Sequence, residues 1–163
     1  MNKLQYTSIG IIRSPFKEAK GTPIQFSAAQ DIEGKVEVDP DYAEGLQDLR
    51  DFSHIILIYH FHRVKNAALK VTPFMDDKKH GIFSTRAPNR PNPIGFSVVK
   101  LNKIEANILH VSGMDIIDGT PLLDIKPYVP EFDIINTDQK GWLEKNVKKL
   151  QEAKDDGRFI DDK

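Results

Sequence analysis

Short runs of apolar and β-branched residues, separated by turn-forming residues, fill most of the chain. They predict strands over residues 4–13, 34–38, 53–62 and 81–86, and an antiparallel hairpin within residues 95–118. Residues 53–62 are apolar at both sets of alternating positions, so we expect a central strand that is buried on both faces. A turn at Asp118-Gly119 then introduces one further short strand.

Helical periodicity is scarce before residue 137, where only residues 41–52 predict a short helix. A longer helix is predicted over 137–155, from an apolar stripe of Trp142, Leu143, Val147 and Leu150. The gaps between strands are too short for the helices that a parallel α/β sheet needs. We therefore expect a mainly β fold, a small closed β-barrel with short helices, over residues 1–136, and a C-terminal helical tail over 137–163.

One unusual segment, FSTRAPNRPNPIGFS at residues 83–97, is called the strap below. Each of its three prolines fixes its own φ and restricts the preceding residue to extended backbone. We therefore expect a stiff, extended segment that holds Arg86, Arg90 and Asn92 in set directions. A rigid turn with no binding role would also explain the prolines, although such turns seldom need two guanidinium groups.

Composition and charge narrow the function. The 163 residues include no cysteine, which excludes disulfides, thiolate metal sites and a cysteine nucleophile. The first residues do not resemble a signal peptide and no apolar run approaches the ~20 residues of a membrane helix, so we expect a soluble cytoplasmic protein. Residues 63–103 hold nine Lys or Arg and two Asp within a chain of net charge −1. This basic region fits either a polyanion-binding face or a solvated lysine face.

Motifs for familiar chemistries are absent. The chain has no dinucleotide or P-loop fingerprint, which argues against an ordinary Rossmann methyltransferase or dehydrogenase. His54, His60 and His62 share one predicted strand face, but His54 lies about 20 Å from His60 at ~3.3 Å per residue, so we expect no metal site. A carboxylate, an ammonium and a phenol at Asp118, Lys126 and Tyr128 suit a polar ligand or a proton transfer. Residue chemistry alone does not select the reaction.

Four segments together resemble one family. They are GIIRSPF at 10–16, FSHIILIYHFH at 52–62, GIFSTRAPNRPNPIGFS at 81–97 and DIIDGTPLLDIKPYVP at 115–130. These strings resemble the TsaA-like family, also called the TrmO family of tRNA N6-threonylcarbamoyladenosine methyltransferases. The resemblance implies a small non-Rossmann barrel that forms a homodimer, and S-adenosylmethionine as methyl donor. It also implies a tRNA substrate whose adenosine beside the anticodon carries a threonylcarbamoyl group.

The resemblance also implies a cofactor site. Its matching positions are Pro23, Ile24, Gln25, Phe61, His62, Arg86, Phe96, Asp115, Ile116, Ile117 and Asp118. An arginine fork at 86 suits the carboxylate of the cofactor, and aromatic rings at 61 and 96 suit its adenine or sulfonium.

Chemistry at the substrate nitrogen suggests further roles. That nitrogen is urea-like and must lose its proton, so Asp118 or Tyr128 is expected as the base, with Lys126 stabilising developing negative charge. Substrate contacts are expected from Arg90, Asn92, Lys78 and Lys79. The alternatives are a non-catalytic module that binds a nucleotide or the cofactor and acts on a protein partner, and a metal-dependent barrel hydrolase that uses the histidines.

Overall fold

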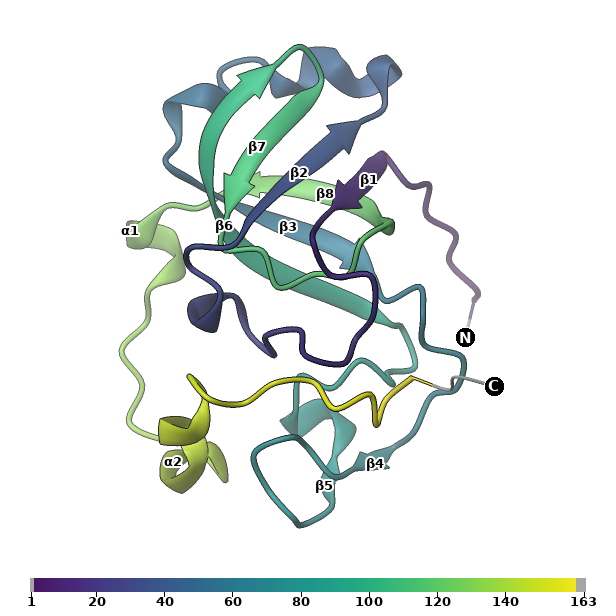
Figure 1. Ribbon diagram of the computed structural model, residues 1–163, viewed down its shortest axis with the longest axis vertical. Coiled ribbons are helices and arrows are strands. Elements are labelled where there is room, and N and C mark those ends of the chain that lie inside the picture. Colours follow the sequence, from purple (N-terminus) through teal and green to yellow (C-terminus); the bar gives the residue numbers. More distant parts are fainter. Residues whose placement is uncertain (1, 161–163) are drawn as a thin grey trace.

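Six strands close into an antiparallel barrel in the computed structural model, which describes residues 2–160 (Figure 1). Around the barrel the strands follow the order β1-β2-β7-β6-β3-β8. Their bounds are Gly10–Arg13 for β1, Glu33–Val38 for β2, His54–His60 for β3, Ile94–Glu105 for β6, Ile108–Ser112 for β7 and Thr120–Pro127 for β8. The predicted mainly β fold with a closed barrel is therefore confirmed.

The barrel core comes from alternate positions on its strands. On β3, Ile55, Leu57 and Tyr59 point inward and are buried, while the residues between them are only half-buried. The expectation that this strand is buried on both faces was wrong, because a closed barrel fills its inside from one face and leaves the other partly open. The inner side chains that are fully buried include Ile12, Val36, Val99, Leu109, Val111, Met114 and Leu122.

Several predicted elements are shorter than the sequence suggested. The first strand begins at Gly10 instead of residue 4. Residues 41–52 form two 3₁₀ helices, η2 at Pro40–Leu46 and η3 at Leu49–Asp51. They do not merge into one helix because Asp48 between them has a positive φ of 62°. In the predicted strand at 81–86, only Gly81 belongs to a strand, β5 at His80–Gly81, and a turn of 3₁₀ helix, η4 at Ile82–Ser84, follows it.

A small lobe lies beside the barrel. Its two short strands, β4 at Lys70–Val71 and β5, pair with each other (Figure 1). Val71 and Ile82 form the core of this lobe together with Ala87 of the strap and Phe159 of the C-terminal tail. The lobe is therefore held together by segments that are far apart in the sequence.

The C-terminal tail is mostly irregular. After a short α1 at Pro130–Asp133, the tail up to residue 160 is helical only in α2 at Leu143–Asn146 and in η5 at Val147–Lys149, which is less than the helix predicted over 137–155. Beyond these turns the chain extends and forms a β-bridge between Lys154 and Pro23, in the loop after β1. That loop contains one more 3₁₀ turn, η1 at Phe26–Ala28. No helix in the described part of the chain is long and apolar enough to cross a membrane.

Candidate functional site

A pocket of about 780 Å³ lies where one end of the barrel meets the small lobe and the tail. The end of β3, the starts of β6 and β8, and the loops after β1 and β7 all contribute to its lining. Its volume is within the range of small-molecule and cofactor pockets. Because barrel closure brings these strand ends together, residues that are far apart in the sequence line a single cavity.

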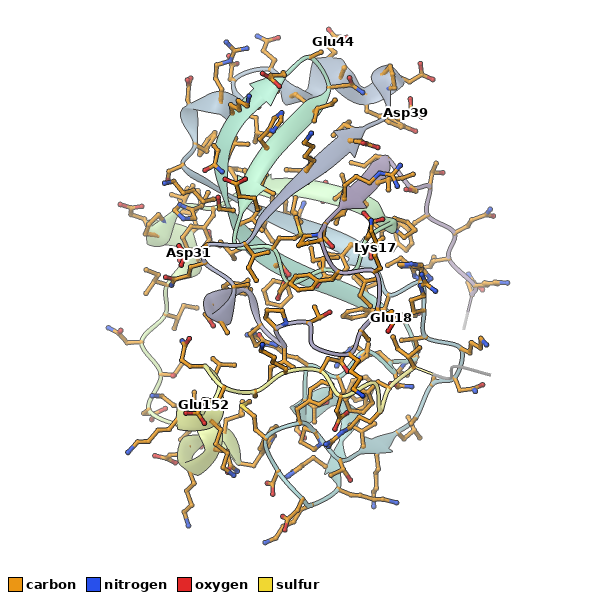
Figure 2. The ribbon with its side chains drawn as sticks, in the orientation of Figure 1. Lys17, Glu18, Asp31, Asp39, Glu44 and Glu152 are labelled. Carbon is orange, nitrogen blue, oxygen red and sulfur yellow. The ribbon has the colours of Figure 1, made fainter. Side chains whose placement is uncertain are left out.

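Ten of the eleven residues expected at a cofactor site line this pocket. They are Pro23, Ile24, Gln25, Phe61, His62, Arg86, Phe96, Asp115, Ile116 and Ile117. The eleventh, Asp118, lies outside the lining. Its carboxylate accepts from the backbone N–H of Ser14 at 3.1 Å and from Lys17 at 2.7 Å, so it holds the loop after β1, on which Figure 2 labels Lys17. These partners lower the pKa of Asp118, with the Lys17 hydrogen bond as the main cause.

The strap presents Arg86 to the pocket. The Arg86 Nη1 donates to Gln25 Oε1 at 2.6 Å, and its guanidinium carbon lies 5.1 Å from the centre of the Phe96 ring. A hydrogen bond and a cation–π contact thus orient the guanidinium, whose other nitrogens can bind an anion bidentately. This arrangement agrees with the expectation that the strap fixes the direction of this arginine.

Arg90 lines the pocket too, but it also braces the strap. Its Nη1 donates to the carbonyls of Ile82 at 3.2 Å and Thr85 at 2.9 Å, and its guanidinium carbon lies 5.8 Å from the Phe83 ring. Removing Arg90 would therefore disturb the fold of the strap as well as the pocket.

The other expected substrate contacts lie elsewhere. Neither Asn92 nor Lys79 lines the pocket, and both are exposed. Lys78 lines a second, more open hollow of about 840 Å³, beside Lys145 and Lys149 of the tail. The structure thus separates the lysines from the pocket that holds the two arginines.

A buried chain of hydrogen bonds ends in the pocket at Asp115. Ser97 Oγ donates to Asp115 Oδ1 at 2.6 Å, and the hydroxyl of Tyr59 lies 3.1 Å from Ser97 Oγ. Ser97 is fully buried and Tyr59 is almost so. Burial raises the pKa of Asp115 to about 7, against the opposing effects of the Ser97 hydrogen bond and of Arg86. Burial and the nearby Asp115 charge also raise the pKa of the Tyr59 phenol.

Gly95 makes room for this chain of hydrogen bonds. A Cβ at this position would lie 2.7 Å from Tyr59 Cζ and 2.6 Å from Phe61 Cζ, closer than real contacts allow. The two rings pack edge to face at 5.4 Å. The glycine at the end of the strap therefore lets Tyr59 and Phe61 pack over the backbone at the pocket's edge.

His62 has a fixed tautomer in this pocket. The Thr120 hydroxyl donates to the carbonyl of Ile117 at 2.7 Å, so its oxygen accepts from His62 Nδ1 at 3.2 Å. Burial, Arg63 and His60 lower the pKa of His62, in that order, which favours the neutral ring. The described residues contain no group of three side chains that could hold a metal ion, so the three histidines do not form such a cluster there.

Lys126 and Tyr128 lie toward the other end of the barrel. Lys126 on β8 pairs with Ile56 near the start of β3, whereas the pocket lies at the end of β3. The Lys126 ammonium forms an exposed ion pair with Asp124 at 2.7 Å. The Tyr128 ring packs edge-on against His54 at 6.4 Å. Neither residue is among those that line the pocket.

The tail supplies a wall of the pocket that was not assigned from the sequence. Trp142 donates through Nε1 to the Ser84 carbonyl at 2.8 Å and stacks on His80 at 4.6 Å. The apolar stripe at 142–150 was the sequence feature that could have indicated this wall, but the stripe does not specify which surface of the protein it packs against. The tail residues in the lining are Trp142, Leu143, Val147, Leu150, Asp155, Phe159 and Ile160.

Comparison with known proteins identifies the family of this fold and pocket. Residues 11–134 match the family model described as the tRNA-methyltransferase O N-terminal domain. A solved structure of TrmO from Pseudomonas aeruginosa superposes with a TM-score of 0.73 at 38% identity, over 86% of this chain and 63% of that one. The chain thus spans under two thirds of the length of that structure.

Relatives in other organisms are similar over most of the chain. A protein of Pyrococcus abyssi named a probable S-adenosyl-L-methionine-binding protein is 65% identical over 95% of this chain and 84% of its own length. A human protein named tRNA (adenine(37)-N6)-methyltransferase is 38% identical over 77% of this chain but only 30% of its own length. The chain therefore belongs to the TrmO family of S-adenosylmethionine-dependent tRNA methyltransferases.

Proposed function

We propose that this protein transfers the methyl group of S-adenosylmethionine to N6 of threonylcarbamoyladenosine beside the anticodon of tRNA. The observation that carries the proposal is the pocket, which unites ten expected cofactor residues and both strap arginines. The family and its named relatives support the reaction class and a tRNA substrate. The threonylcarbamoyl group is the finer part of the proposal.

The donor set of the pocket fits the cofactor. Arg86 carries a guanidinium for the carboxylate, and Phe61 and Phe96 offer aromatic faces for an adenine or a cation. Asp115 adds a carboxylate for polar hydrogens or for positive charge. S-adenosylmethionine, when bound, would supply an electrophilic methyl group on its sulfonium. The residues of this pocket then hold the two reactants in line, which is the main requirement for methyl transfer.

The threonylcarbamoyl group adds a carboxylate to the adenosine, and we assign it to Arg90. Among the described residues, the hydrogen bonds that the Arg90 side chain donates use Nη1, which leaves Nε and Nη2 for a substrate anion. The predicted roles of Asp118, Lys126 and Tyr128 in proton transfer stay predictions. None of them lines the pocket, so groups within the lining are candidates for the base as well.

The basic region of the sequence indicates where tRNA would dock. Figure 2 shows Asp39 and Glu44 at the end of the barrel away from Glu152 and the tail. The basic region at 63–103 includes the strap and the small lobe, next to the pocket. Seven of its nine cations precede β6, while Lys100 and Lys103 lie on β6 toward the opposite end, so a polyanion would meet most of the positive charge of this region beside the pocket. We propose that tRNA docks on the pocket side, with Asn92, Lys78 and Lys79 among its contacts.

Mass spectrometry of tRNA nucleosides tests the proposal. The protein is incubated with methyl-labelled cofactor and two matched tRNA samples, one with and one without the threonylcarbamoyl group. We expect label on the modified adenosine in the first sample alone. Arg90→Ala should reduce this preference, with Arg90→Lys as a control that keeps the charge. Tight cofactor binding without label in either tRNA would instead favour a non-catalytic cofactor-binding module.

We further propose that the protein is a homodimer, as the resemblance to the family implies. Phe132, Ile134 and Ile135, at and just after α1, are 77%, 63% and 79% exposed. Three neighbouring exposed apolar side chains are typical of a surface that another chain covers. Light scattering should give a dimer mass for the wild type and a monomer mass for Phe132→Glu with Ile135→Glu. The matched control is Leu4→Glu, at an exposed apolar residue elsewhere in the chain, and a monomeric wild type would contradict the proposal.

A further inference from the structure

The proposed reaction leaves one proton to be removed. The reacting nitrogen gains a methyl group and must give up its hydrogen, and a base at pocket depth has to receive it. Two titratable groups with polar atoms in the lining, His62 and Asp115, are held by hydrogen bonds from inside the barrel. The two residues have different hydrogen-bond partners and opposite pKa shifts, and these differences distinguish which one can act as the base.

We propose that Asp115 accepts the N6 proton during methyl transfer, and that Ser97 and Tyr59 are positioning residues that hold its carboxylate. The inference rests on the proposed function and names the base for the same pocket. It is carried by the buried line of oxygen atoms from Tyr59 through Ser97 to Asp115 Oδ1.

The direction of donation along this line follows from the number of protons. A serine hydroxyl has one hydrogen, and Ser97 gives it to Asp115 Oδ1. Its oxygen must therefore accept from Tyr59, whose hydroxyl keeps its proton because burial raises its pKa. Both hydroxyls thus donate toward the carboxylate. This arrangement fixes Oδ1 and leaves Oδ2 as the oxygen that can accept a proton from a ligand.

The charge balance of the reaction suits this carboxylate. A bond forms between N6 and the methyl carbon while the sulfur–methyl bond breaks, and its electron pair stays on sulfur. The N6–H bond breaks, its electron pair stays on nitrogen, and the proton goes to Asp115 Oδ2. One positive sulfonium and one negative carboxylate become a neutral thioether and a neutral carboxylic acid. A half-buried carboxyl whose pKa is raised by burial gains a proton more readily than an exposed one.

The charged groups that face Asp115 are few. Burial raises the pKa of Asp115 and the Arg86 charge opposes this rise, while Tyr59 faces Asp115 from β3 through Ser97. His62 lies in the same lining, but its pKa responds to Arg63 and His60, and its Nδ1 is held by Thr120. His62 is therefore one competing base, and its own anchor, Thr120, offers a matched control. Asp155 of the tail, which also lines the pocket and whose pKa is raised by burial, is another.

The first measurement needs no substrate. In a carbon-detected NMR titration of the free protein, the Asp115 carboxyl should titrate near pH 7. Ser97→Ala removes a hydrogen bond to the charged form, so this midpoint should rise by about one to two pH units. Tyr59→Phe acts through Ser97 and should raise the midpoint by less. A midpoint near 4 in the wild type would overturn the inference.

The second measurement follows single-turnover methyl transfer against pH, with saturating cofactor and threonylcarbamoylated tRNA. The acid limb of the wild-type profile should move to higher pH in Ser97→Ala and stay in place in Thr120→Val. Asp115→Asn should lose roughly 10²- to 10⁴-fold in rate at saturating cofactor. The opposite pattern, in which only Thr120→Val moves the limb, would assign the base to His62.

Two outcomes separate this inference from the proposed function. A wild-type protein that binds the cofactor and methylates no tRNA refutes the proposed function. A wild type that methylates tRNA, beside an Asp115→Asn variant that loses only cofactor affinity in calorimetry and keeps its rate at saturation, refutes the role of Asp115 alone.

Discussion

Replacing Asp115 with asparagine should stabilise the free protein at neutral and alkaline pH. Burial raises the pKa of Asp115 to about 7 in the folded state, whereas a carboxyl in an unfolded chain has a pKa of about 3.9. The folded state therefore binds this proton more tightly, and the wild type loses stability as the pH rises from about 4 to about 7. Asparagine does not titrate, and its carbonyl oxygen can still accept from Ser97.

The size of the effect follows from the two pKa values. They differ by about three, which corresponds to roughly 4 kcal/mol in the free energy of unfolding at pH 8. This figure is an upper value, because asparagine loses some strength of the charge-assisted hydrogen bond. Below about pH 4 the carboxyl is neutral in both states, so the variant and the wild type should have nearly equal stability.

Urea denaturation at a series of pH values measures the difference directly. Asp118→Asn is the matched control, since Lys17 and the Ser14 N–H lower the pKa of Asp118. Its contribution is present above the unfolded pKa and is lost as the pH falls through the folded pKa, so this variant should be less stable than the wild type at pH 8. Equal stability of Asp115→Asn and wild type across pH 5 to 8 would refute the reasoning, because the Asp115 charge would then be well solvated.

Three further predictions concern other parts of the site. Arg86→Lys keeps the charge but loses the planar fork, so calorimetry should show about 10- to 100-fold weaker cofactor binding with little change in Tm; unchanged affinity would mean that Arg86 does not bind the carboxylate. Phe159→Ala should lower the free energy of unfolding by about 3 kcal/mol, because this ring is part of the core of the small lobe. Urea denaturation measures this free energy, and a loss under 1 kcal/mol would mean that the tail is loosely attached. The double variant Lys78→Glu with Lys79→Glu should bind tRNA more weakly and with a smaller salt dependence, and its cofactor affinity should be unchanged. Titrations with tRNA at two salt concentrations measure this, and an unchanged tRNA affinity would mean that the two lysines belong to a solvated face.

The strands of the barrel were predictable from the sequence, because the pattern of apolar residues within one short stretch is enough to indicate each strand. Alternating apolar residues in the β6–β7 hairpin specify extended chain with one face inside, whereas β3 is apolar at both sets of positions and its single inner face depends on barrel closure. The errors lie where tertiary contacts override local preference. The tail has a helical stripe, yet its chain becomes extended where Asp155 exchanges backbone hydrogen bonds with Gly21 and Thr22 at 2.7 and 2.9 Å.

The site was predictable where a motif encodes backbone geometry. Prolines and the glycine at position 95 marked the strap, and the structure brings both of its arginines to the pocket. Electrostatic roles were less accessible. Asp115 and Asp118 are three residues apart in one motif, yet burial raises the pKa of the first while Lys17 lowers that of the second. A sequence string does not state which carboxylate faces the inside of the barrel, so the choice of base needed the structure.

One wall of the pocket is formed by residues that the family model matches, and another is formed by tail residues that follow the matched segment. The family model ends at residue 134, whereas Trp142, Leu143 and Phe159 line the same cavity. The wall from the barrel and strap holds the groups suited to the cofactor. The facing tail wall rests on the lobe through Phe159 and on the loop after β1 through Lys154. Changes in the tail can thus reshape the pocket and leave the cofactor groups in place, which explains why the motifs pointed to a methyl donor and left the tail's role open.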